Sequence, residues 1–136
     1  MKIEGACHCG LIAYEAEIDP ATVTICHCTD CQTLSASAFR TLVPARKEVF
    51  KILSGEARKY VKTAESGNKS VQSFCGECGS GIYSSAAVKD PPVFMIRVGT
   101  IRQRAELSPK SQMWCRSALD WVSGVWPEKK FAKAAG

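Results

Sequence analysis

The chain has 136 residues, 46% of them hydrophobic, a length that suits one domain and is too short for two independent cores. The formal net charge is +5, but the basic residues are scattered among acidic ones, so nucleic acid is not an expected partner. No apolar run approaches the length of a membrane-spanning helix, and polar residues interrupt the N-terminus where a secretory signal would need an apolar core. We therefore expect a cytoplasmic protein without a membrane partner, whose thiols stay reduced.

Most segments of the sequence are typical of β-strands. Residues 11–18 alternate apolar and mostly polar side chains, as a half-buried strand does. Residues 93–98 form a β-rich run that begins after Pro92 and ends at Gly99. The other short candidates are residues 39–43, 49–53, 59–61 and 71–74. Turn signals separate the candidates at Asp19-Pro20, Val43-Pro44, Ser54-Gly55 and Ser66-Gly67-Asn68.

Helix signals are few. Thr29 or Asp30 could cap a short helix over residues 31–38, because a side-chain oxygen there can accept from the first free amides. A second short turn is expected over residues 117–122. The predicted fold class is therefore mainly β, with one domain over residues 1–128 and a short basic C-terminal tail over residues 129–136.

Seven of the eight cysteines fall into three tight groups, and this spacing is typical of metal ligands. Cysteines this close in sequence cannot easily form disulfides with each other, because that bond needs a particular Cα separation and torsion angle. Thiolates two or three positions apart can instead point at one zinc ion about 2.3 Å from each sulfur. The groups are Cys7 and Cys9, then Cys26, Cys28 and Cys31, then Cys75 and Cys78.

Two of the groups supply a complete tetrahedral site. Gly10 follows the first pair and Gly79 follows the last, and glycine permits the positive φ that turns backbone amides toward a bound sulfur. Four thiolates leave no open position on zinc, so this is the pattern of a structural ion that belongs to the fold. The predicted structural ligands are Cys7, Cys9, Cys75 and Cys78.

The remaining group, Cys26, Cys28 and Cys31, provides three ligands and no obvious fourth. Three protein ligands with an open position are typical of a catalytic zinc ion, and three thiolates favour a small-molecule thiol as the incoming ligand. These three cysteines are the predicted catalytic residues, and the protein is expected to hold two zinc ions. The alternative is a second structural ion with Cys115 as fourth ligand, although a lone cysteine in an apolar stretch is more often a buried small hydrophobe.

Three polar residues lie beside the cysteines and are expected to support the metal sites without binding the metal. His8 and His27 each lie between two cysteines, so in an extended segment each histidine would point to the side opposite the two cysteines. We expect each to hydrogen-bond a carbonyl or carboxylate rather than bind the metal. Asp30 is expected to be a helix cap or an acceptor beside the site rather than a base.

These motifs resemble the family of glutathione-dependent formaldehyde-activating enzymes and centromere protein V. The similarity continues through Ser37-Ala38-Phe39, Gly99-Thr100 and the region from Pro109 to Trp121, so it spans most of the chain. The motifs that carry it are Gly5-Ala6-Cys7-His8-Cys9-Gly10, Cys26-His27-Cys28-Thr29-Asp30-Cys31 and Phe74-Cys75-Gly76-Glu77-Cys78-Gly79-Ser80.

The resemblance implies a β-tent fold of antiparallel strands around two zinc sites, with the same division of the cysteines. It also implies the family's named activity, which joins glutathione to formaldehyde as S-hydroxymethylglutathione and is classed as a carbon–sulfur lyase in the reverse direction. The small-molecule partner would then be a thiol such as glutathione. An alternative function is a non-enzymatic zinc module for a protein partner, as the centromere branch of the family suggests.

The chain departs from this family after the third cysteine of the central group. Relatives often carry a basic pair and Ser-Gly there, whereas this chain has Gln32, Thr33, Ser35 and Ala36. Cations beside the site would be natural partners for the two carboxylates of glutathione. The candidates for replacing the basic pair are Lys69, Arg97, Arg102 and Arg116.

Overall fold

Ten strands form two sheets in the structure, a computed structural model that describes residues 1–124 and 126–134. The smaller sheet is antiparallel, in the order β1-β2-β5, with β1 at Lys2–Ala6, β2 at Ala13–Glu17 and β5 at Phe50–Ser54. The larger sheet has the order β10-β3-β4-β9-β8-β7-β6, and its strands pair antiparallel except for the parallel pair β3–β10. Its strands are β3 at Thr24–Cys26, β4 at Arg40–Arg46, β6 at Arg58–Thr63, β7 at Lys69–Phe74, β8 at Gly81–Ala86, β9 at Val93–Arg97 and β10 at Ser111–Met113.

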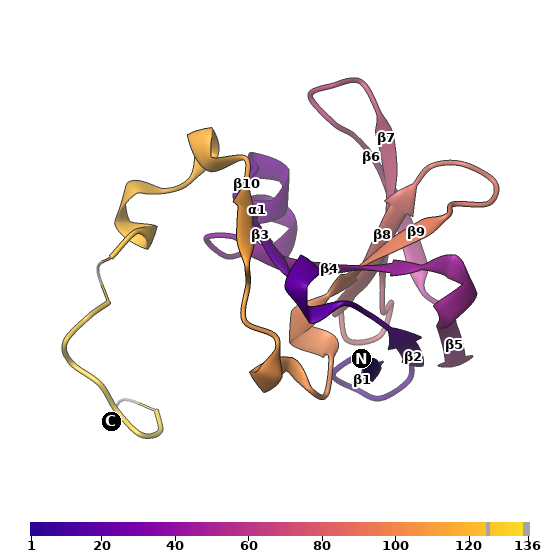
Figure 1. The fold of residues 1–136 in the computed structure, drawn as a ribbon, viewed down its shortest axis with the longest axis horizontal. Coiled ribbons are helices and arrows are strands. Elements are labelled where there is room, and N and C mark those ends of the chain that lie inside the picture. The colour runs from indigo at the N-terminus through magenta and orange to yellow at the C-terminus, as the bar shows by residue number, and fades with distance from the viewer. Residues whose placement is uncertain (125, 135–136) are drawn as a thin grey trace.

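The hydrophobic core lies between the two sheets (Figure 1). The smaller sheet contributes Ile3 and Tyr14, and the larger sheet contributes Val43, Ile82 and Ile96, all of them 2% exposed or less. Burial of these large side chains is the main favourable term that holds the sheets together. The prediction of a mainly β fold is confirmed.

The described residues contain one α-helix, α1 at Thr29–Ser35, which begins two residues earlier than the sequence predicts and ends three residues earlier. The predicted cap at Thr29 or Asp30 is wrong. Cys28 is the N-cap, and its Sγ accepts a hydrogen bond from the Cys31 amide at 3.2 Å. Short 3₁₀ helices lie at Pro20–Thr22, Lys47–Val49, Val98–Thr100, Arg104–Glu106, Cys115–Ser117 and Asp120–Val122, the last two in place of one turn over 117–122.

The turn predicted at Val43-Pro44 is absent from the structure. Pro44 lies inside β4 and faces Met95 of β9, so the chain does not turn at this point. A proline has no amide hydrogen to give to a ladder, and it is tolerated in a strand where one side is unpaired. The pairing of β3 with β4 reaches only as far as Leu42, so Pro44 faces no strand on that side.

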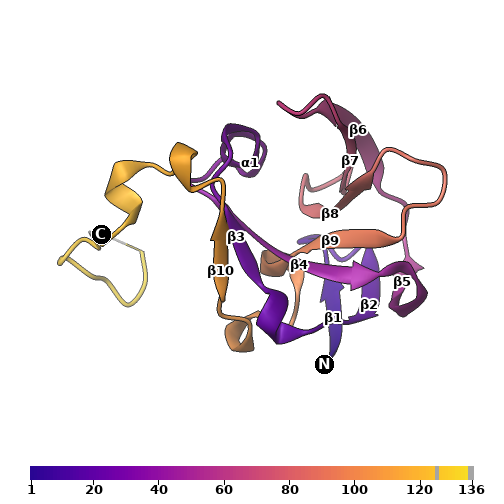
Figure 2. The same cartoon turned by 45° about the horizontal axis from the view of Figure 1, so that its top comes forward.

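The chain beyond β10 leaves the two sheets and extends as an arm (Figure 2). Within the described residues, no helix is long and apolar enough to span a lipid bilayer. The predicted basic tail over residues 129–136 includes residues 135–136, which lie outside the described residues.

Gly5 lies in β1 opposite Tyr14 of β2, and the tyrosine ring fills the space where a side chain would stand. A Cβ at Gly5 would lie 2.1 Å from Tyr14 Cζ, and Tyr14 is 1% exposed with its hydroxyl 2.7 Å from Thr100 Oγ1. The ring therefore has no free space to move into. We expect Gly5→Ala to lower the free energy of unfolding by about 1–3 kcal/mol, as overpacking does. Thermal or urea unfolding would measure this loss.

Gly99→Ala is the matched control for that substitution. Gly99 is exposed, and a Cβ there would meet no atom within 4 Å. Its free energy of unfolding should change by no more than about 0.5 kcal/mol. Equal effects of the two substitutions would contradict the close packing of Tyr14 on Gly5.

Candidate metal centres

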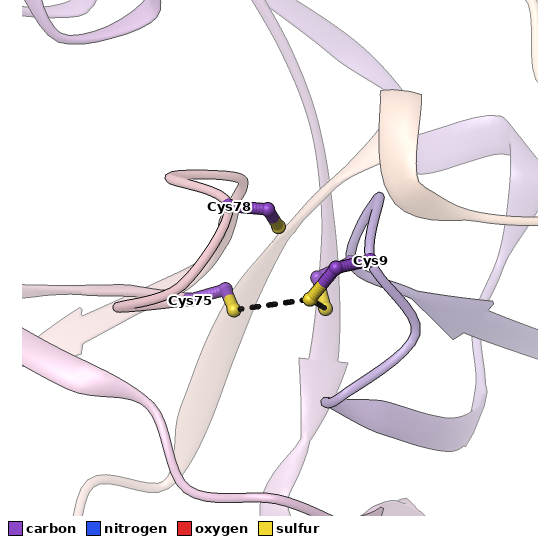
Figure 3. A group of neighbouring side chains, drawn as sticks. Cys9, Cys75 and Cys78 are labelled. Atoms are coloured by element: carbon purple, nitrogen blue, oxygen red, sulfur yellow. Dashed lines mark hydrogen bonds between the residues drawn. The ribbon is translucent and has the colours of Figure 1, made fainter.

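Four cysteines from two distant parts of the chain converge into one group. Cys7 and Cys9 follow β1, and Cys75 and Cys78 follow β7. Their Sγ atoms all lie within 4.8 Å of one another, with 3.6 Å between Cys7 and Cys9 and 3.8 Å between Cys9 and Cys75. Figure 3 shows Cys9, Cys75 and Cys78 of this group pointing toward one another. A tetrahedral zinc ion with sulfurs about 2.3 Å away would hold those sulfurs about 3.8 Å apart. All four thiols are free, and the group could hold a metal ion.

Tight turns position these thiols. The amide of Gly10 donates to the carbonyl of Cys7 at 3.0 Å, and the amide of Gly79 donates to the carbonyl of Cys75 at 2.8 Å. Gly10 and Gly79 have φ values of 82° and 78°, a left-handed conformation that favours glycine. The glycine pattern in the sequence therefore predicts the local geometry correctly.

Ser80 links the two turns. Its hydroxyl accepts a hydrogen bond from the His8 amide at 3.0 Å and lies 3.3 Å from the Sγ of Cys78. Hydrogen bonds from the Ser80 side chain and backbone lower the pKa of Cys78 to about 5. This shift favours the thiolate, which is the form that binds a metal ion.

The second group consists of three cysteines around the start of α1. Cys26 ends β3, Cys28 caps α1 and Cys31 lies in its first turn, and their Sγ atoms lie within 4.8 Å of one another. A hydrogen bond from Cys31 lowers the pKa of Cys26 to about 5, and the charge of Arg40 acts in the same direction. The pKa of Cys31 is raised, because a hydrogen bond to Cys26 stabilises the protonated form of its thiol. We refer to these three residues as the cysteine trio.

No fourth cysteine, histidine, aspartate or glutamate joins the trio among the described residues. Cys115 belongs to neither metal group, and the expectation that it is buried is wrong because its side chain is exposed. Cys115 begins the 3₁₀ helix Cys115–Ser117 shortly after β10, where it lines a surface cleft and not the core. The trio could thus hold a metal ion with one position left for another ligand.

The polar neighbours of the trio hold its surrounding elements together. His27 is 1% exposed, and its Nε2 lies 2.8 Å from the amide oxygen of Gln112, so it belongs to neither metal group. Gln32, one of the departures in the sequence, donates at 2.9 Å to the backbone carbonyls of both His27 and Ser117. Asp30 is not a cap but forms an ion pair with Lys62 of β6 at 2.9 Å.

The four basic residues that were candidates for replacing the basic pair lie in different parts of the structure. Arg102 pairs with Glu4 on the surface, and Arg116 pairs with Glu65 at 2.7 Å. Lys69 begins β7 at an exposed position. Arg97 alone among the four candidates is buried, at 9% exposed.

Arg97 lies beside Arg40, which sequence analysis did not select. Both guanidinium groups donate to the Oε1 of Gln72, Arg97 at 2.6 Å and Arg40 at 3.1 Å. Burial and the charge of Arg40 lower the pKa of Arg97 to about 9, while the trio thiols act in the opposite direction. No local sequence signal identifies Arg40 or Gln72, because only the pairing of strands brings them together.

The model of the family described as "Glutathione-dependent formaldehyde-activating enzyme" matches residues 2–117 of the chain. The chain belongs to this family. The matched residues include both cysteine groups of this chain. The match confirms the resemblance inferred from the motifs.

A solved structure supports the fold of this family member. The crystal structure of a Rhodobacter sphaeroides protein, a structural-genomics target, is 19% identical in sequence and superimposes with a TM-score of 0.63. The alignment covers 80% of this chain and 98% of that chain. At this identity the similarity shows the fold alone. No curated protein matches the chain.

Proposed function

We propose that this protein is a zinc-dependent carbon–sulfur lyase acting on a small thiol adduct, with glutathione and formaldehyde as the preferred pair. The observation that carries this proposal is the unequal number of thiols in the two groups: four converge in one and three in the other. The family match supports the choice of substrate, because the family is described by its dependence on glutathione and its activation of formaldehyde. A reducing cytoplasm would keep all seven thiols available.

The two groups would have different roles. We assign a structural zinc ion to Cys7, Cys9, Cys75 and Cys78, whose spacing fits a closed tetrahedron. We assign the second zinc ion to Cys26, Cys28 and Cys31. When bound there, zinc supplies one open coordination position and stabilises an incoming thiol as its nucleophilic thiolate.

The burial of the trio indicates the side from which a substrate would enter. Cys26 and Cys31 are buried, whereas Cys28 is half-buried and lines a cleft of about 380 Å³. Asp30 and Lys62 line the same cleft. Lys62 is held in place by its ion pair with Asp30, so its ammonium could donate a hydrogen bond to a substrate oxygen that gains negative charge.

The proposed reaction needs no oxidant or reductant. The thiol sulfur forms a bond to the carbonyl carbon of formaldehyde, and the π pair of the carbonyl moves to its oxygen. The proton that leaves the thiol ends on that oxygen, which gives the hydroxymethyl thioether; the lyase direction is the reverse. The protein would contribute mainly by placing the thiol and the aldehyde together, because they also combine without a catalyst.

Exchange NMR tests the proposal directly. Zinc-loaded protein should accelerate the exchange between glutathione and S-hydroxymethylglutathione in proportion to protein concentration. Cys115→Ser should exchange as fast as the unmodified protein, because Cys115 is exposed and lies outside both groups. Protein-independent exchange with two zinc ions bound would contradict the proposal.

One observation favours the alternative, a non-catalytic module for a protein partner. The C-terminal arm presents large aromatic side chains to solvent, with Trp121 62%, Trp126 81% and Phe131 53% exposed. Exposed aromatic residues are enriched where proteins bind one another. A folded, zinc-loaded protein that neither binds thiols nor catalyses the exchange would support this alternative.

A further inference from the structure

Two arginines near the trio share one amide acceptor and have no carboxylate partner. Arg97 and Arg40 both donate to Gln72 Oε1, at 2.6 and 3.1 Å. Among residues 1–124 and 126–134, no carboxylate lies within 4.0 Å of either guanidinium group. A buried charge is normally paired, so two neighbouring like charges with a neutral partner are an arrangement that an anion would stabilise.

Strand register places these arginines on the same face of the large sheet as Cys26. Cys26 of β3 is directly opposite Arg40 of β4, and Leu42 of β4 is directly opposite Arg97 of β9. Directly opposed residues share a face of the sheet, and so do residues two apart in one strand. The trio and the two guanidinium groups are therefore neighbours on one surface.

The charges of this surface leave a net positive balance. Three thiolates and one divalent ion would together carry about one negative charge. Arg40 and Arg97 carry two positive charges, and within the described part of the chain their side chains donate only to neutral acceptors, Gln72 and the carbonyl of Met95. Each guanidinium has five N–H donors, so donors remain for a ligand.

A cleft gives a ligand access to these donors. It has a volume of about 360 Å³ and is lined by Arg40, Arg97, Gln72, Tyr60 and Leu34, among others. Tyr60 and Lys62 lie two apart on β6, so the cleft at the arginines and the cleft at Cys28 both border one face of that strand. Each cleft is by itself of the size that small-molecule sites have.

We propose that Arg40 and Arg97, positioned by Gln72, bind a carboxylate of the thiol substrate while its sulfur occupies the trio. This inference rests on the proposed function and adds a substrate class to it: small thiols that carry a carboxylate. A guanidinium recognises a carboxylate through two parallel N–H···O bonds, which also orients the rest of the molecule.

Binding to zinc-loaded protein by calorimetry tests the inference. Two matched thiol pairs are used: mercaptopropionate with mercaptopropionamide, and glutathione with its glycine amide. Each pair differs in one carboxylate, so the affinity ratio within a pair reports the contribution of that group. In at least one pair, the unmodified protein should bind the carboxylate form about tenfold to a hundredfold more tightly.

The variants Arg40→Gln and Arg97→Gln should reduce that ratio to near one while leaving the affinity for the amide form within about threefold. Arg40 is only half-buried, so Arg40→Gln remains informative if Arg97→Gln fails to fold. Arg102→Gln is the matched control, because Arg102 is exposed and paired with Glu4, and it should retain the full ratio. Zinc content and thermal unfolding of each variant confirm that the comparison is between folded proteins.

The outcomes separate this inference from the proposed function. If both members of each pair bind equally to the unmodified protein, or if the preference survives in Arg40→Gln and Arg97→Gln, the carboxylate site is overturned and the proposed function stands. If no thiol binds to protein that holds two zinc ions, the proposed function fails, and this inference fails with it.

Discussion

Replacing Cys75 by serine is expected to abolish the folded state. Cys75 is fully buried, and the group to which it belongs joins Cys9 to a residue 66 positions later. Binding of a structural zinc ion contributes about 10–16 kcal/mol in zinc-finger peptides, which is as large as the whole stability of a typical domain, about 5–15 kcal/mol. Loss of one ligand from a closed site should therefore leave little of the cooperative unfolding transition. Circular dichroism with thermal unfolding would measure it.

Cys115→Ser is the control for this substitution, since it also removes a thiol but from an exposed position outside both groups. It should keep the thermal midpoint and the zinc content of the unmodified protein. A Cys75→Ser variant that folds normally with one zinc ion fewer would show that the four-cysteine group does not hold the fold together.

Replacing Cys28 by serine is expected to empty the second site and leave the domain folded. The trio lies within one short segment, so a metal ion bound there would close only a short loop. Closing a short loop removes little conformational entropy from the unfolded chain. Cys26 and Cys31 pack in a small cluster with Leu42, apart from the main core between the sheets. Serine is also a favourable N-cap, so the start of α1 keeps its hydrogen-bond acceptor.

The measurements for Cys28→Ser are zinc content, thermal unfolding and the glutathione exchange rate. We expect about one zinc ion per chain in place of two, a loss of stability no greater than about 2 kcal/mol, and exchange at the uncatalysed rate. A variant that retains two zinc ions and normal exchange would remove Cys28 from the catalytic site. A variant that unfolds as Cys75→Ser does would make both ions structural.

Local patterning predicted most strands but missed those without a local signal. β3 and β10 have three residues each, too few to show alternation, and they exist because they pair with each other and with β4. β8 contains Ser84 and Ser85 and is formed by its neighbours on both sides. The turn expected at Pro44 is absent because the open edge of β4 tolerates proline, a fact of sheet order that the residue itself does not carry.

Short-range sequence therefore determined the cysteine turns within each of the three groups, because spacings of two or three residues fix thiol positions within a few backbone torsions. Which groups share a site depends on the tertiary structure, which brings Cys75 and Cys78 to Cys7 and Cys9. Tertiary structure alone decided the surroundings of those sulfurs. Arg40 faces Cys26 and Arg97 faces Leu42 only through the pairing of β3, β4 and β9, and only the tertiary structure leaves Cys115 exposed and outside both metal groups. Strand register depends on the whole core, since a shift of one residue would turn each of these side chains to the other face.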